Sequence, residues 1–102
     1  MALTPIRYAE FHDVPRVFAL EHAGSLYVFD CPFDERADEY PDGYAVYRIP
    51  GATLASTAGT SWPALINAGQ PVGHCDLSDV HFDATRRASV DDAVLARGLT
   101  SA

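Results

Sequence analysis

The sequence predicts a mainly β domain (β-rich α+β), built as a small antiparallel meander or a partly open SH3-like barrel of about five strands with a short C-terminal helix. Three observations predict this class: short apolar runs separated by turn residues, a tight-turn pair between two of these runs, and helical spacing near the C-terminus. A flat antiparallel sheet with a helix packed on one face is the alternative. The barrel comparison concerns architecture only and implies no function.

The first three expected strands are the best defined. Residues 6–10 (IRYAE) alternate with period two, as a half-buried strand does, and HDVP then interrupts the pattern. Residues 16–22 (RVFALEH) and 25–31 (SLYVFDC) are apolar on both faces. Between them, Ala23 and Gly24 are expected to form a tight turn, because Gly readily takes the positive φ that such turns require. This hairpin is therefore predicted at the centre of the sheet.

The middle of the chain predicts a strand, a loop and a helical turn. Residues 43–49 (GYAVYRI) alternate as a further strand. Residues 50–61 are small and rich in hydroxyl groups, without an apolar period, and are expected to form a mobile loop. A short helical turn is expected to follow, with Ser61 as its N-cap and Gly69 at its end, since Pro63 is tolerated in a first turn.

The last third of the chain has weaker patterns. Residues 72–83 (VGHCDLSDVHFD) predict one strand, straight or bulged, that ends at Asp83. Ser89 has the character of an N-cap and Gly98 that of a helix stop, so residues 89–98 predict the closing helix. This helix is expected to cover an open end of the barrel or to lie against a partner.

Length and composition are those of one globular domain that spans residues 1–102. The chain is 48% hydrophobic and 11% aromatic, which is far from the composition of disordered proteins. It has no apolar run close to the roughly 18 residues of a membrane span, and its start, MALTPIRYAE, lacks the pattern of a signal peptide. We therefore expect a cytoplasmic protein without membrane association. The two cysteines are too few for a disulfide framework.

The charges of the chain point away from nucleic acids. The formal net charge is −7, and such a surface repels the phosphate backbone, so no nucleic-acid partner is expected. All seven positive charges are Arg and Ala is frequent, which we interpret as codon bias of a GC-rich bacterial genome.

The potential metal ligands do not have the spacing of a metal site. They are His12, His22, His74, His81, Cys31 and Cys75. Structural zinc sites usually have paired ligands two to four residues apart, whereas the only close pair here is His74 and Cys75, whose side chains lie on opposite faces of a strand. The acidic residues lack the register of a calcium-binding loop. We predict no metal and no cofactor.

Catalytic motifs are also absent from the sequence. It has no G-x-S-x-G elbow, no P-loop and no G-x-G-x-x-G motif. Asp34 and Asp38, or Glu35 and Glu39, would form a carboxylate pair only in a helical segment, and no catalytic residue is assigned. The alternative that stays open is a small enzyme or ligand-binding β-barrel that uses a Cys/His/Asp cluster in the second half, formed around His74, Cys75 and His81.

One connection carries most of the negative charge. The stretch DCPFDERADEYPDGY, residues 30–44, has six acids and one Arg, a net charge of −5 out of −7 for the whole chain. Aromatic residues are interleaved with these acids, and PDGY favours a defined turn. Carboxylates that steer a basic partner, together with rings that supply contact area, are typical of a recognition site. The predicted partner-binding residues are Asp34, Glu35, Asp38, Glu39 and Tyr40.

Two simpler interpretations of this connection remain. It could be a solvated loop, or Phe33 and Tyr40 could fold back onto the barrel and fix the loop in place. The favoured function is a small non-catalytic bacterial protein-binding module, an accessory, inhibitor or immunity-like factor that meets a basic protein partner. The alternatives are the enzyme described above and a structural protein that self-associates as a homo-oligomer through a strand edge.

Overall fold

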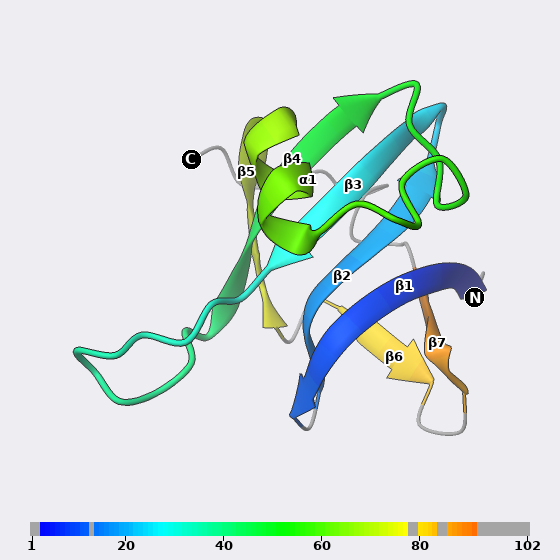
Figure 1. Ribbon diagram of the computed structural model, residues 1–102. Coiled ribbons are helices and arrows are strands. Elements are labelled where there is room, and N and C mark those ends of the chain that lie inside the picture. The colour runs from blue at the N-terminus through cyan, green and yellow to red at the C-terminus, as the bar shows by residue number, and fades with distance from the viewer. Residues whose placement is uncertain (1–2, 13, 78–79, 84–85, 92–102) are drawn as a thin grey trace.

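The computed structural model describes residues 3–12, 14–77, 80–83 and 86–91. They form one antiparallel sheet and one short helix (Figure 1). The elements are β1 (Leu3–His12), β2 (Val14–His22), β3 (Ser25–Asp30), β4 (Gly43–Pro50), α1 (Trp62–Ala68), β5 (Gln70–Asp76), β6 (His81–Asp83) and β7 (Arg86–Asp91). The strand order is β5-β4-β3-β2-β1-β7-β6, so the first five strands form a meander. The predicted fold class, a mainly β antiparallel meander, is confirmed.

The central hairpin is confirmed together with its turn. His22 of β2 pairs with Ser25 of β3, which leaves only Ala23 and Gly24 in the loop. Both have positive φ, 50° and 79°, as the two central residues of a type I′ turn require. The backbone twist of this turn matches the twist of the strands, so the local sequence sets the register of the hairpin.

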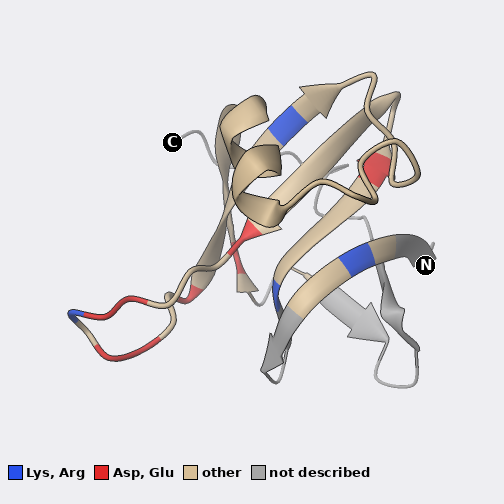
Figure 2. Cartoon of the chain, viewed as in Figure 1, with Lys and Arg blue, Asp and Glu red and all other residues tan. Residues whose placement is uncertain are grey.

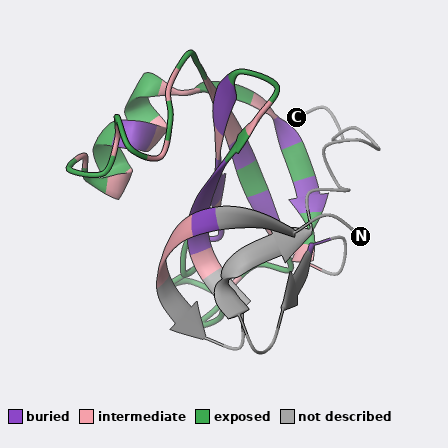
Figure 3. Ribbon diagram, turned by 90° about the vertical axis from the view of Figure 1, so that its right-hand side faces the viewer, coloured by how far each residue is buried: buried purple, intermediate pink, exposed green. Residues whose placement is uncertain are grey.

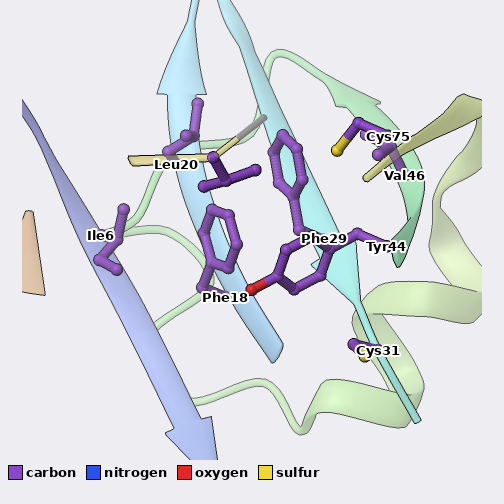
Figure 4. Close-up of a cluster of buried hydrophobic side chains, with 9 residues drawn as sticks. Ile6, Phe18, Leu20, Phe29, Cys31, Tyr44, Val46 and Cys75 are labelled. Atoms are coloured by element: carbon purple, nitrogen blue, oxygen red, sulfur yellow. The ribbon is translucent and has the colours of Figure 1, made fainter. Parts of the chain in front are cut away.

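One face of the sheet encloses the larger part of the core, which we call the inner cluster (Figure 4). Its buried members are Ile6, Phe18, Leu20, Phe29, Cys31, Tyr44, Val46, Cys75 and Val80. Phe18 and Phe29 are directly paired across β2 and β3 and their rings stack at 4.5 Å, while Tyr44 of β4 packs edge-on against both. Because seven of these nine residues come from β1 to β5, the curled sheet buries them in a single contiguous cluster.

The opposite face is covered by α1. Val17, Ala19, Leu26 and Val28 are buried there against Leu65, the buried residue of the helix. Figure 3 shows α1 to one side of the strands, with exposed and buried segments along it. As predicted, Ser61 is the N-cap, and its side chain accepts a hydrogen bond from the Ala64 amide at 3.4 Å. The helix ends at Gly69, where a Cβ atom would lie 2.7 Å from the Cβ of Tyr47. A helix on one face of the sheet is thus a feature shared with the alternative architecture.

The two weakest sequence predictions need correction. Residues 72–83 do not form one strand: β5 ends at Asp76 at one edge of the sheet, and β6 lies at the opposite edge. Residues 89–91 are the end of β7 and pair with β1, so the predicted helix does not begin at Ser89, and its remainder lies outside the described residues. Sheet pairing overrides the capping preference of Ser89, because the preference is local and worth only about 1 kcal/mol. The described sheet has seven strands, where about five were predicted, and the first five of them form the meander.

The loop that precedes α1 is held by hydrogen bonds. Arg7 of β1 donates to the carbonyls of Thr57 and Thr60 at 2.9 and 2.8 Å, and the Leu54 amide donates to Glu21 Oε1 at 2.6 Å. Whether residues 50–61 are mobile in solution stays a prediction.

Candidate functional site

The acidic connection forms a hairpin that projects from the sheet between β3 and β4 (Figure 1). Asp34 and Glu39 form an isolated antiparallel bridge: the Asp34 amide donates to the Glu39 carbonyl at 2.8 Å and the Glu39 amide donates to the Asp34 carbonyl at 3.2 Å. We call residues 33–40 the acidic hairpin. It is a short structured projection, which differs from a loop without internal hydrogen bonds.

The tip of the acidic hairpin is built by two of its own acids. Asp34 Oδ1 accepts hydrogen bonds from the amides of Arg36 and Ala37, at 3.0 and 3.3 Å. Asp38 has a φ of 54°, a left-handed conformation that Asp tolerates better than most residues with a Cβ. The turn therefore uses the acids as structural residues. Their side chains nevertheless stay at the surface, because every residue from Phe33 to Glu39 is exposed.

Tyr40 lies at the base of the acidic hairpin and is only partly exposed. The Arg16 Cζ of β2 lies 4.4 Å from the centre of the Tyr40 ring, and the ring packs against the inner cluster. Phe33 contacts Tyr40 edge-on, with 5.1 Å between the ring centres. Tyr40 therefore fixes the hairpin to the sheet, as the fold-back interpretation proposed, while its neighbour supplies the exposed ring.

Phe33 and Arg16 are not among the predicted partner-binding residues. Phe33 is 46% exposed and is the only large hydrophobic side chain that is exposed among those the structure describes. Its exposure has no signal in the sequence, since Phe33 and Tyr40 both lie amid acids. Arg16 precedes the acidic hairpin by a whole strand, and only the β2–β3 pairing brings it there.

Cys31 anchors the start of the same projection. Its amide donates to the Arg16 carbonyl at 2.7 Å, and its Sγ lies 3.3 Å from the Pro41 carbonyl oxygen, which it contacts as a donor. Arg16 Nη1 approaches the same sulfur at 3.8 Å. Burial raises the pKa of the Cys31 thiol above its ordinary value of 9.0, and the contact with Arg16 offsets only part of this effect. Cys31 is therefore a protonated structural thiol and a poor nucleophile at neutral pH.

The second strand of the projection is fixed as well. The Leu77 amide, just after β5, donates to the Asp42 carbonyl at 2.9 Å. With Cys31 held on one side and Asp42 on the other, the acidic hairpin leaves the sheet in a defined direction. Figure 2 shows its acidic residues grouped along the projection, away from the sheet. Residues 33–40 hold four acids against Arg36, a net charge of −3.

Two members of the Cys/His/Asp set of the second half, His74 and Cys75, do not face one another. His74 is exposed and Cys75 is 6% exposed, since neighbours in β5 point to opposite faces of the sheet. The imidazole therefore cannot act as a base for the adjacent sulfur. The side chain of His81 lies outside the described residues. Where side chains are described, no three His, Cys, Asp or Glu residues are grouped so that they could hold a metal ion.

The β5 edge of the described sheet has two features that disfavour pairing with another strand. In the described sheet β5 is an outermost strand. Pro71 has no amide hydrogen to donate, and the β4–β5 register shifts between Val46 and Tyr47. Proline and irregular register are devices that protect edges from edge-to-edge association.

Comparison of the chain with known protein families, with curated proteins and with solved structures finds no significant match. In the part of the chain that the structure describes, no helix has both the length and the apolar character needed to cross a membrane.

Proposed function

We propose that the protein is a small non-catalytic binding module of the bacterial cytoplasm that presents the acidic hairpin to a basic surface of another protein. Its role is that of an accessory, inhibitor or immunity-like factor. The observation that carries the proposal is the combination of four exposed acids and one exposed ring on a hairpin whose base is fixed by Arg16 and Cys31.

Each group has a distinct role in this proposal. The carboxylates of Asp34, Glu35, Asp38 and Glu39 steer a basic partner, because a focused field of one sign raises the rate of encounter. Phe33 supplies apolar contact area, and its edge-on contact with Tyr40 holds the exposed ring against the base of the acidic hairpin. Because the tip is already ordered by hydrogen bonds, binding costs less conformational entropy than it would for a disordered acidic segment.

The test is affinity capture from a lysate of the source cells with three forms of the protein. The neutralised variant carries D34N, E35Q, D38N and E39Q; Asn keeps the acceptor oxygen at position 34 and tolerates the left-handed φ at position 38. The control R36Q removes the only cation of the hairpin, so its charge changes in the opposite direction. We expect a protein that is retained by the wild type and R36Q, lost from the neutralised variant and eluted by salt. Equal retention by all three forms contradicts the proposal.

A further inference from the structure

A groove lies between α1 and the sheet, on the face opposite the inner cluster. It has a volume of about 510 Å³. Ala9 and Val17 of β1 and β2 form its floor, together with Asp30 at the end of β3, and Trp62, Ile66 and Asn67 of α1 form its wall. Most of this lining is apolar, as in sites that bury an apolar side chain.

The wall of the groove is held in place by Arg7. The Arg7 Cζ lies 4.5 Å from the centre of the Trp62 ring, and the same guanidinium donates to the carbonyls of Thr57 and Thr60. These contacts fix the ring without a ligand. They also place a positive charge beside Trp62, so a cation of a bound ligand is favoured at the other end of the groove.

That other end is acidic. Asp30 also lines a second pocket, of about 480 Å³, at the base of the acidic hairpin, together with Asp42, Asp76 and His74. The two pockets adjoin at Asp30, which lines both. Val17, Asp30, Ala45 and His74 are directly paired across β2 to β5, so these four residues lie on the same face of the sheet. The apolar groove therefore meets, at Asp30, a pocket whose lining also includes Asp42 and Asp76.

We propose, building on the proposed function, that this groove takes an extended segment of the same basic partner in which a large apolar side chain is next to an Arg or Lys. The apolar side chain lies between Trp62, Ile66 and Val17, where it leaves water. The basic side chain extends toward the carboxylates of Asp30, Asp42 and Asp76, which supply charge-assisted hydrogen bonds. A segment bound in the reverse direction would place its basic side chain beside Arg7 at the Trp62 end, where the two positive charges would repel.

The experiment is an amide NMR titration of the whole protein with three short synthetic peptides of equal length. One contains adjacent Arg and Leu residues, one has Ala in place of Leu, and one has Gln in place of Arg. We expect the first peptide to shift the amides of Val17, Asp30 and Ile66 as well as those of the acidic hairpin. The second is expected to shift the hairpin amides alone, and the third is expected to bind weakly.

Two matched variants make the test specific. N67R places a positive charge on the groove wall and should weaken binding of the Arg-Leu peptide about tenfold, because like charges repel. A68R makes a similar change at the next exposed position, which does not line the groove, and should leave the affinity nearly unchanged. Amide spectra of both variants in the absence of peptide report whether they fold.

The outcomes separate this inference from the proposed function. Shifts that stay in the acidic hairpin with the Arg-Leu peptide overturn the groove and leave the proposed function standing. Equal binding of the Gln-Leu peptide overturns the requirement for a neighbouring cation. Equal weakening by N67R and A68R shows that the peptide lies elsewhere, and no shift in either region contradicts both proposals.

Discussion

Arg16 of β2 lies over the ring of Tyr40, with its Cζ 4.4 Å from the ring centre, and so joins the sheet to the acidic hairpin. The carbonyl of Arg16 also accepts a hydrogen bond from the Cys31 amide. Arg16 Nε is buried and has no hydrogen-bond partner in the described residues, while the guanidinium contacts the Tyr40 ring and, through Nη1, the Cys31 sulfur. Arg16 thus helps to fix the direction in which the acidic hairpin leaves the sheet.

The first prediction concerns this contact. Y40A removes the ring beneath Arg16 and should lower the free energy of unfolding by about 1 to 2 kcal/mol, since it loses both the cation–π contact and packing against the inner cluster. Y40F keeps the ring and should cost less. Hydrogen exchange at the amides of Asp34 and Glu39 should accelerate in Y40A. Unchanged exchange would mean that the acidic hairpin is ordered without Tyr40.

The second prediction compares two phenylalanines. Phe29 is fully buried and stacks on Phe18, so F29A should cost about 3 to 5 kcal/mol, enough to unfold many domains of this size. F33A is the matched control on the exposed ring and should cost less than about 1 kcal/mol. Urea denaturation measures both. A cost for F29A below about 1 kcal/mol would show that the central hairpin is peripheral to the core.

The third prediction is a loss of stability at alkaline pH. Burial raises the pKa of Cys31 above 9.0 and that of Tyr44 above 10.0 in the folded protein. The unfolded chain therefore loses these protons at a lower pH than the folded protein does. The resulting stability is fully present below about pH 9 and is lost as the pH rises through the folded pKa values.

Urea denaturation at a series of pH values from about 8 to about 11 tests this dependence. C31A removes one of the two groups and should make the decrease shallower. A free energy of unfolding that stays constant over this range, or that increases, would contradict the assignment of both groups as buried and protonated.

Local sequence patterns correctly predict the turn of the central hairpin and the N-cap of α1. They do not predict features that depend on pairing between strands far apart in the chain. Ala23–Gly24 and Ser61 were found because their chemistry acts on adjacent backbone groups. The division of residues 72–83 was missed because apolar alternation does not say which edge of a sheet a strand joins. The prediction of Ser89 as a helix N-cap is wrong because Ser89 pairs with Pro5 of β1, and the sequence around Ser89 carries no sign of this long-range pairing.

In the candidate site too, local features are predicted from the sequence, whereas features that depend on contacts between separate elements are not. That Asp34, Glu35, Asp38 and Glu39 are exposed follows from composition and turn signals, and the structure agrees. Which of the two rings is the more exposed is not predictable, because Tyr40 is covered by Arg16, which comes from another strand, and both rings lie amid acids in the sequence. The groove beside α1 was also missed, since its floor and wall come from four separate elements.

The fourth prediction is that the neutralised variant folds. Exposed charges of one sign contribute little favourable energy and repel one another, so its free energy of unfolding should lie within about 0.5 kcal/mol of the wild type or slightly above it. The substitutions keep the acceptor of Asp34 and the left-handed position 38. A loss of more than about 2 kcal/mol in urea denaturation would assign the acids to stability and not to recognition.

The most direct test of the central claim is the association rate constant of the captured partner, measured against ionic strength for the wild type, R36Q and the neutralised variant. Steering by the acidic hairpin predicts that the neutralised variant associates more slowly at low salt and depends less on salt, while R36Q associates faster. The three rates should converge as salt screens the charges. An unchanged association rate for the neutralised variant at low salt would contradict the claim and leave the acidic hairpin as a solvated projection.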